Sequence, residues 1–293
     1  MTDWTWEEVA HQDSLTEGPA WDGSALLYSQ CYANLTWRYD PQTGDNAVWR
    51  RDTRGGNGMV FDKDGRLFVC EGAGRRVTRV ENGELVEVVA DKYEGKTLNA
   101  PNDLAIDSRG RVWFTNPNYG ERPMELDHES VHRADPGPDG SWSVTRVTFD
   151  TNRPNGILFS IDQNTLYVAE SPNNPSQRRE LRAYPVRDDG ALGDHEVLHD
   201  FGTGRGIDGM CLDTEGNVIA TAGSYQAGPG PMIYVFAPGG RVISTHPTPV
   251  DMPTNCTFGE AGLDVLYVTF GTGHVYRAPD TGRRGRLAYP PAH

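Results

Sequence analysis

The 293-residue sequence has no long apolar run, and none approaches the ~18 residues that a membrane-spanning helix requires. Its first residues, MTDWTWEEVAHQD, lack the apolar core of a secretion signal. Cysteine is scarce: the four cysteines form no Cys-x-x-Cys pair, and each adjoins an apolar run. We interpret them as small buried residues in a reduced setting. These absences predict a cytoplasmic protein with no membrane partner.

Basic residues are few relative to acidic ones. The chain has 27 Lys and Arg against 41 Asp and Glu, a formal net charge of -14. A net-negative surface repels phosphate backbones and anionic lipid surfaces, so nucleic acid and membranes are excluded as expected partners. A small-molecule substrate remains the expected partner, and no oligomeric state is predicted.

Long helical periodicity is also absent, and a repeat takes its place. Six segments each combine a polar residue, a short apolar stretch, a turn and a second apolar stretch. The leading polar residues lie 40 to 53 positions apart, at Glu17, Asn57, Asn102, Asn155, Asp208 and Asn255. Turns of the form D-x-x-G join the two stretches, for example at 62–65, 107–110 and 213–216. Each repeat is therefore interpreted as a β-hairpin.

Hairpin units of this length, often followed by another strand as at 76–80 and 275–278, are typical of four-stranded propeller blades. We predict an all-β fold, a six-bladed β-propeller of four-stranded antiparallel blades around a central metal-binding channel. The whole chain, 1–293, is expected to form this single domain. We expect amino-terminal residues to pair within the last blade and close the ring.

The six leading residues share one phase of the repeat, so they are expected to ring one end of the channel. They offer carboxylate and amide oxygens, which suit a divalent cation: Ca²⁺ first, with Zn²⁺, Mg²⁺ or Mn²⁺ as alternatives. Two simpler interpretations remain. Asn57-Gly58 and Asn155-Gly156 are common hairpin-turn dipeptides, and the ring could serve only structural hydrogen bonding.

Two familiar motifs fail in their context. His128-Glu-Ser-Val-His132 matches a zinc-protease pattern that needs a helix, whereas this segment is predicted to be a strand. Gly204-Arg-Gly-Ile-Asp-Gly209 matches a dinucleotide-binding fingerprint, but a strand is predicted where the helix should begin.

The repeats resemble the SMP-30/gluconolactonase/luciferin-regenerating family. The matching runs include EGPAW (17–21), LNAPNDLAIDSRGRVWFTNPNYG (98–120) and RPNGILFSIDQNTLYVAE (153–170). The resemblance implies one channel metal held by Glu17, Asn155 and Asp208. It implies that Asn102 contacts substrate or completes the metal shell, and that Asp208 is the general base. Asn57 and Asn255 are expected to line the channel.

The resemblance predicts a divalent-metal-dependent hydrolase that opens a lactone by metal-activated water. The chain departs from sugar-lactone members at Ala100, where they carry Arg, and at Asn116, where they carry Asp; we interpret the Asn116 segment as a surface turn. Alternative functions are therefore a phosphotriesterase, a dehydratase, isomerase or lyase of a biosynthetic pathway, or a non-enzymatic binding module. Aromatic loops are expected around the channel mouth, carrying Trp37, Tyr119, Tyr225 and His274.

Overall fold

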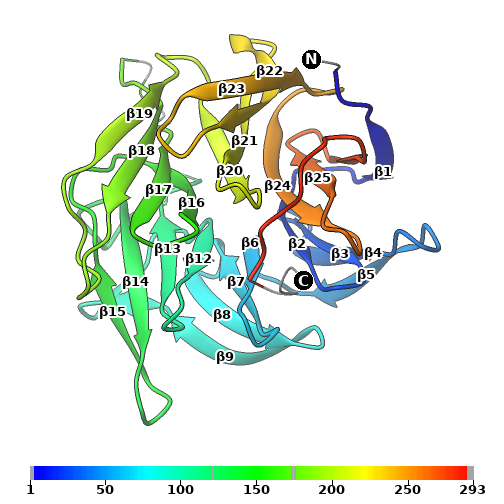
Figure 1. The fold of residues 1–293 in the computed structure, drawn as a ribbon. Coiled ribbons are helices and arrows are strands. Elements are labelled where there is room, and N and C mark those ends of the chain that lie inside the picture. Colours follow the sequence, from blue (N-terminus) through cyan, green and yellow to red (C-terminus); the bar gives the residue numbers. More distant parts are fainter. Residues whose placement is uncertain (1–2, 121, 173, 175, 289–293) are drawn as a thin grey trace.

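The computed structural model describes residues 3–120, 122–172, 174 and 176–288. These residues form six four-stranded antiparallel sheets that stand as blades around a common axis (Figure 1). The predicted six-bladed β-propeller is thereby confirmed.

Five blades take four consecutive strands each. The first blade contains β2 (Thr16–Trp21), β3 (Leu26–Gln30), β4 (Leu35–Tyr39) and β5 (Asn46–Arg51), and the second β6 (Gly56–Phe61), β7 (Leu67–Glu71), β8 (Arg76–Glu81) and β9 (Glu84–Ala90). The third contains β12 (Leu104–Ile106), β13 (Val112–Asn116), β14 (Ser130–Pro136) and β15 (Trp142–Arg146). The fourth contains β16 (Pro154–Phe159), β17 (Thr165–Glu170), β18 (Glu180–Pro185) and β19 (Glu196–Asp200). The fifth contains β20 (Ile207–Leu212), β21 (Val218–Ser224), β22 (Ala227–Phe236) and β23 (Val242–Pro247).

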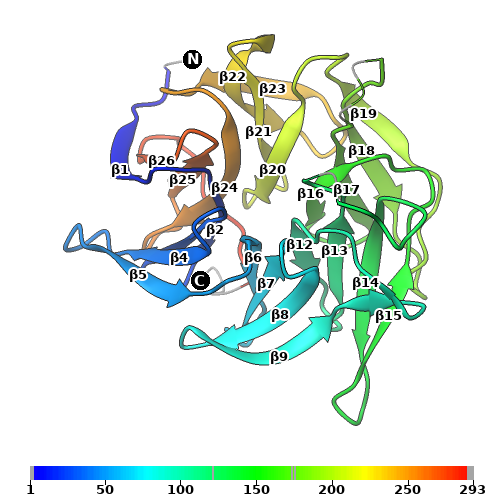
Figure 2. The ribbon, with the colours of Figure 1, turned by 180° about the vertical axis from the view of Figure 1, so that it is seen from behind.

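The sixth blade joins both ends of the chain. It takes β24 (Pro253–Gly259), β25 (Val265–Phe270) and β26 (His274–Ala278) from the last repeat, and its outer strand is β1 (Glu7–His11). Seen from behind, β1 lies along the outer edge of this blade (Figure 2). Ring closure by amino-terminal residues is confirmed, and β1 covers the edge of β26 that would otherwise be unpaired.

The D-x-x-G turns form because the aspartate side chain replaces missing backbone partners. In the second blade, Asp62 Oδ1 accepts hydrogen bonds from the N–H groups of Asp64 (3.0 Å) and Arg66 (2.9 Å). Gly65 supplies the left-handed conformation that ends the turn, with φ of 77°. Asp107 and Asp213 make the same kind of contacts in the third and fifth blades. The hairpin prediction is confirmed at all three turns.

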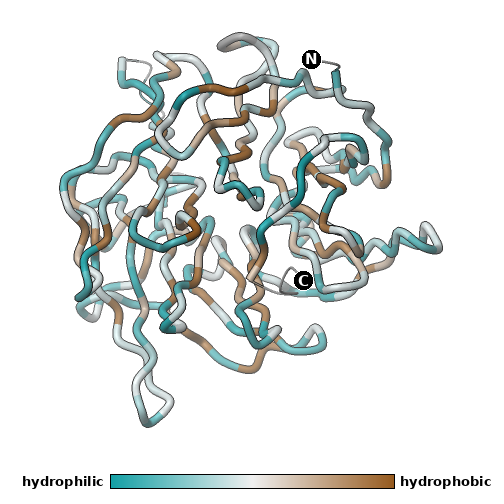
Figure 3. Tube along the Cα trace, in the orientation of Figure 1, coloured by the Kyte–Doolittle hydropathy of each residue, from teal (hydrophilic) through white to brown (hydrophobic). Residues whose placement is uncertain are grey.

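Burial falls from the inner strands to the rim. Second strands such as β3, β7, β13, β21 and β25 are buried along their whole length, whereas the outer strands β15, β19 and β1 are mostly exposed or half-buried. Hydrophobic positions accordingly follow the strands, and the loops are largely hydrophilic (Figure 3). The largest fully buried side chains include Trp113, Tyr28 and Tyr267, which pack between neighbouring blades.

Two features lie outside the repeat. A small hairpin, β10 (Lys92–Tyr93) with β11 (Lys96–Thr97), connects the second and third blades. After β26 the chain crosses one end of the propeller, where Arg286 N–H donates to Leu212 O at 2.9 Å (Figure 1). In the part of the chain that the structure describes, no helix has the length and apolar character needed to span a membrane.

Candidate active site

A β-bulge sits at the leading polar residue of most innermost strands. The register shifts at Glu17–Ala20, Gly56–Met59, Pro154–Ile157, Ile207–Met210 and Pro253–Cys256. In the third blade β12 begins only after Asn102 and Asp103. A bulge interrupts the strict alternation of side chains and re-aims one of them. The repeated bulge therefore turns the polar residues toward the axis, while the apolar remainder of each strand packs between blades.

Glycine follows the polar residue because adjacent blades nearly touch there. A Cβ on Gly156 would lie 2.5 Å from the carbonyl oxygen of Asp208, and one on Gly58 would lie 2.5 Å from Asp103 Oδ1. Neither glycine has a positive φ, although both residues at the centre of a type I′ turn need one. The hairpin-turn interpretation of these Asn-Gly pairs is therefore wrong. Close packing around the axis explains the glycines.

One end of the channel holds a cavity of about 500 Å³. Five of the six predicted residues line it: Glu17, Asn57, Asn102, Asn155 and Asp208. The other lining residues include Cys31, Tyr32, Ala100, Tyr119 and Arg122. We call it the front cavity. Of the four aromatic residues expected at the mouth, Tyr119 is among its lining residues. Trp37 instead donates to Gln30, and Tyr225 is exposed.

Asn255 departs from the expected single ring. It lines a second cavity of about 450 Å³ toward the other end of the channel, together with Asp103 and the carboxy-terminal residues Arg286 to Ala288. Its Oδ1 accepts from Cys256 N–H at 2.9 Å, and its Nδ2 donates to Asp103 Oδ2 at 3.3 Å. Asn255 thus forms part of the layer beneath the front cavity.

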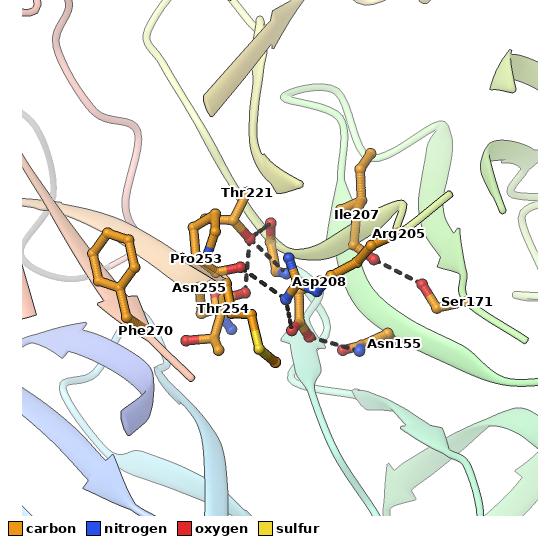
Figure 4. A network of polar contacts seen from close by, with 12 residues as sticks. Asn155, Ser171, Arg205, Ile207, Asp208, Thr221, Pro253, Thr254, Asn255 and Phe270 are labelled. Carbon is orange, nitrogen blue, oxygen red and sulfur yellow. Dashed lines mark hydrogen bonds and ion pairs between the residues drawn. The ribbon is translucent and has the colours of Figure 1, made fainter. Parts of the chain in front are cut away.

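Asp208 stands in a dense polar network (Figure 4). Arg205 donates to Asp208 Oδ2 at 2.6 Å, and Asn155 Nδ2 donates to Asp208 Oδ1 at 2.6 Å. Arg205 also binds the carbonyl oxygens of Gly223 (2.8 Å) and Pro253 (2.9 Å). Asn155 Nδ2 in turn lies 2.8 Å from the hydroxyl of Tyr119. The network ties the fifth blade to both neighbouring blades and holds the carboxylate in one orientation.

Three carboxyl groups share this small buried region, and burial raises the pKa of each. Burial raises the pKa of Glu17 well above its ordinary value, and the charges of Asp208 and Asp103 raise it further. Burial likewise raises the pKa of Asp208, against the opposing effect of Arg205. For Asp103, burial raises the pKa to about 7. The ionised forms of these carboxyl groups are therefore disfavoured unless a cation compensates them, and among the described residues Arg205 is the one cationic side chain that forms an ion pair with them.

This arrangement fits a divalent cation. Glu17 is 4% exposed and accepts from Gly18 N–H at 2.8 Å, but within the described ranges it joins no ion pair. A buried carboxylate without a countercharge is costly, and a hard cation among carboxylate and amide oxygens relieves that cost. Glu17, Asn155 and Asp208, with Asn102 beside them, are the residues whose side-chain oxygens could hold it.

Comparison with known proteins identifies the family of this chain. The family description SMP-30/Gluconolactonase/LRE-like region matches residues 15–272. The chain belongs to this family. A gluconolactonase of Zymomonas mobilis is 30% identical over 285 residues, which cover 87% of this chain and 76% of that protein. A pentonolactonase of Haloferax volcanii is 26% identical, covering 88% of this chain and 82% of that one.

A solved gluconolactonase from Xanthomonas campestris superposes with a TM-score of 0.81 and 31% identity, covering 94% of this chain and 89% of the other. The family membership inferred from the six repeats is therefore confirmed, and it associates the chain with lactonase-type hydrolases.

Sequence reasoning missed Arg205 and Asp103, and it misjudged Asn116. Arg205 lies in the Gly204–Gly209 segment, whose match to a dinucleotide-binding fingerprint was rejected. The structure agrees with that rejection, since strand β20 begins at Ile207 where the fingerprint requires a helix. Asp103 occupies the position that glycine fills in four other repeats, which was the available signal. Asn116 is no surface turn: it is fully buried, and its Oδ1 accepts from Asn99 N–H at 2.9 Å, which braces the loop before Asn102.

His132 lies in β14, as predicted, so the protease pattern has no helix.

Proposed function

We propose that this protein is a divalent-metal-dependent lactonase, which hydrolyses the ester bond of a cyclic substrate. The observation that carries the proposal is the convergence of Glu17, Asn155, Asp208 and Asn102 on one cavity, in a chain of the gluconolactonase-like family. A cavity of about 500 Å³ is within the usual range for small-molecule sites and has room for a five- or six-carbon lactone.

Glu17, Asn155 and Asp208 would hold the cation. When bound, it would supply Lewis-acid stabilisation of the developing oxyanion and lower the pKa of water beside it. Ca²⁺ is the first candidate because the donors are all oxygen atoms, with Zn²⁺, Mg²⁺ or Mn²⁺ as alternatives.

Asp208 would accept the proton of the attacking water and return it to the ring oxygen as the carbon–oxygen bond breaks. Arg205 fixes one oxygen of that carboxylate at 2.6 Å and so positions it. Asn102, which is 6% exposed and lines the cavity, would donate from its amide to a substrate oxygen.

Substrate selection would depend on the other residues that line the cavity. Ala100 offers only a methyl group to the cavity, where sugar-lactone relatives are expected to carry Arg. Arg122 also lines the cavity, and two of its nitrogens are committed to the carbonyls of Gly72 (3.0 Å) and Ala73 (3.2 Å). These features favour a lactone with fewer hydroxyl groups than a hexonolactone.

A pH-indicator assay over sugar, aliphatic and aromatic lactones tests the proposal. EDTA-treated protein is compared before and after restoring Ca²⁺, Mg²⁺, Mn²⁺ or Zn²⁺. We expect metal-dependent turnover of one lactone class. We also expect Asp208→Asn to abolish it and Asp139→Asn, a change on an exposed hairpin, to leave it intact. Turnover that survives in Asp208→Asn would refute the assignment of the base. A phosphotriester panel run in parallel tests the alternative hydrolase.

A further inference from the structure

A second group of metal-ligating side chains lies on the sixth blade, away from the cavity. It consists of Glu8 and His11 on β1 and His274 on β26. His11 and His274 are direct cross-strand partners, and Glu8 pairs with Tyr276 two positions along β26. Side chains on facing strand positions are neighbours, so this register brings two imidazoles and a carboxylate to one face.

A β-bulge makes this juxtaposition possible. Residues three apart in a regular strand face opposite sides, which would separate Glu8 from His11. The register shifts between Glu8 and Ala10, and both Val9 and Ala10 pack against the hydrophobic core. Because two consecutive residues turn inward, Glu8 and His11 both face outward.

The candidate ligand atoms of the three residues all lie within 4.8 Å of one another. The two imidazole rings stack with centroids 3.9 Å apart, and His274 Nε2 lies 4.0 Å from Glu8 Oε1. Glu8 and His11 are exposed, so small side-chain rotations can close these distances without moving the backbone.

Neighbouring side chains already orient two of the ligands. Thr272 Oγ1 lies 3.0 Å from His274 Nδ1, which leaves Nε2 facing Glu8. Tyr276 donates its hydroxyl to Glu8 Oε2 at 3.2 Å, which leaves Oε1 facing His274. Such outer contacts are what hold histidine and carboxylate ligands in place at metal sites.

We propose that Glu8, His11 and His274 form a transition-metal site, with Zn²⁺ as the fitting ion, that clips the first strand to the last. Two imidazoles and one carboxylate are a recurrent zinc ligand set with a fourth position left for water. This donor set differs from the all-oxygen set of the front cavity, so the two sites should prefer different ions. An ion that binds here in the folded state but not in the unfolded state would stabilise the sixth blade.

The test is a Zn²⁺ titration of EDTA-treated protein in a chelator-competition assay, with three variants. His11→Gln/His274→Gln removes the clip, and Glu17→Gln/Asp208→Asn removes the carboxylates of the front cavity. His195→Gln is the matched control, because His195 Nδ1 lies 2.6 Å from Asp150 in an imidazole–carboxylate pair that belongs to no three-ligand group within the described residues.

We expect the clip variant to lose one equivalent of Zn²⁺, or to bind it at least tenfold more weakly, while the cavity variant retains that equivalent. Zn²⁺ should slow amide exchange in Glu7–His11 in wild type and His195→Gln, but not in the clip variant. Unchanged Zn²⁺ stoichiometry in the clip variant would overturn the proposal. So would loss of all Zn²⁺ binding in the cavity variant.

Discussion

Replacing Asp103 with asparagine should stabilise the folded protein at alkaline pH and change its stability little at acidic pH. Asp103 is 9% exposed beneath the front cavity, and burial raises its pKa to about 7 from 3.8. The folded state therefore holds this proton between pH 4 and 7, whereas the unfolded state releases it. Stability that is present at low pH is lost as the pH rises through this window.

The magnitude follows from the shift. About three pH units at ~1.4 kcal/mol each give a loss of about 4 kcal/mol by pH 8 in the metal-free protein. Asp103→Asn removes this loss. The variant keeps the acceptor for Leu104 N–H (2.9 Å) but places an amide against Asn255 Nδ2, which costs about 1 kcal/mol. We expect the variant to be about 3 kcal/mol more stable at pH 8 and nearly equal to wild type at pH 5.

Urea unfolding at several pH values between 5 and 8, in EDTA, measures this difference. Asp139→Asn, on an exposed hairpin, serves as the charge-matched control. Ca²⁺ should shrink the advantage of Asp103→Asn, because a nearby cation stabilises the ionised carboxylate of the wild type. Parallel pH profiles for Asp103→Asn and wild type would refute the assigned cause.

Three further predictions concern residues that line or lie next to the front cavity. Arg205→Gln should lower the free energy of unfolding by about 2 kcal/mol and kcat by roughly 100-fold, because Asp208 loses its ion-pair partner. Arg205→Lys should recover part of both losses. Equal losses in the two variants would count against an effect of charge. Ala100→Arg should lower KM for sugar lactones roughly tenfold, with unsubstituted aliphatic lactones as the comparison substrates. Gly156→Ala should cost about 2–3 kcal/mol in urea unfolding, because its Cβ would lie 2.5 Å from Asp208 O, whereas Gly239→Ala has no neighbouring atom within 4 Å and should change stability little.

The propeller could be predicted because the blades repeat one local pattern, in which a short turn joins two apolar stretches; in three blades this turn has the form D-x-x-G. A D-x-x-G turn and two apolar stretches specify a hairpin without information from elsewhere in the chain. The small β10–β11 hairpin was missed because it occurs once and has no repeat to support it.

The site was predicted less completely because its geometry depends on contacts between blades. Repeat phase identified the polar residues, and five of them line one cavity. Phase could not separate Asn255 from the others, because its contact with Asp103 joins two repeats 152 positions apart. Nor could any local pattern mark Arg205, whose partners Gly223 and Pro253 belong to later strands.

Ring closure through β1 and β26 also has a consequence for biosynthesis. β1 leaves the ribosome long before its partner strand is made, since Glu7 pairs with Arg277, 270 positions further along the chain. The first five blades can form while translation proceeds, but the sixth cannot be completed until β26 has been made. Until then β1 and the side of β2 that contacts β24 and β25 stay uncovered. A late-closing contact of such long sequence separation slows folding. It also prolongs the time during which unpaired strand edges and apolar surface of the nascent ring are exposed to aggregation.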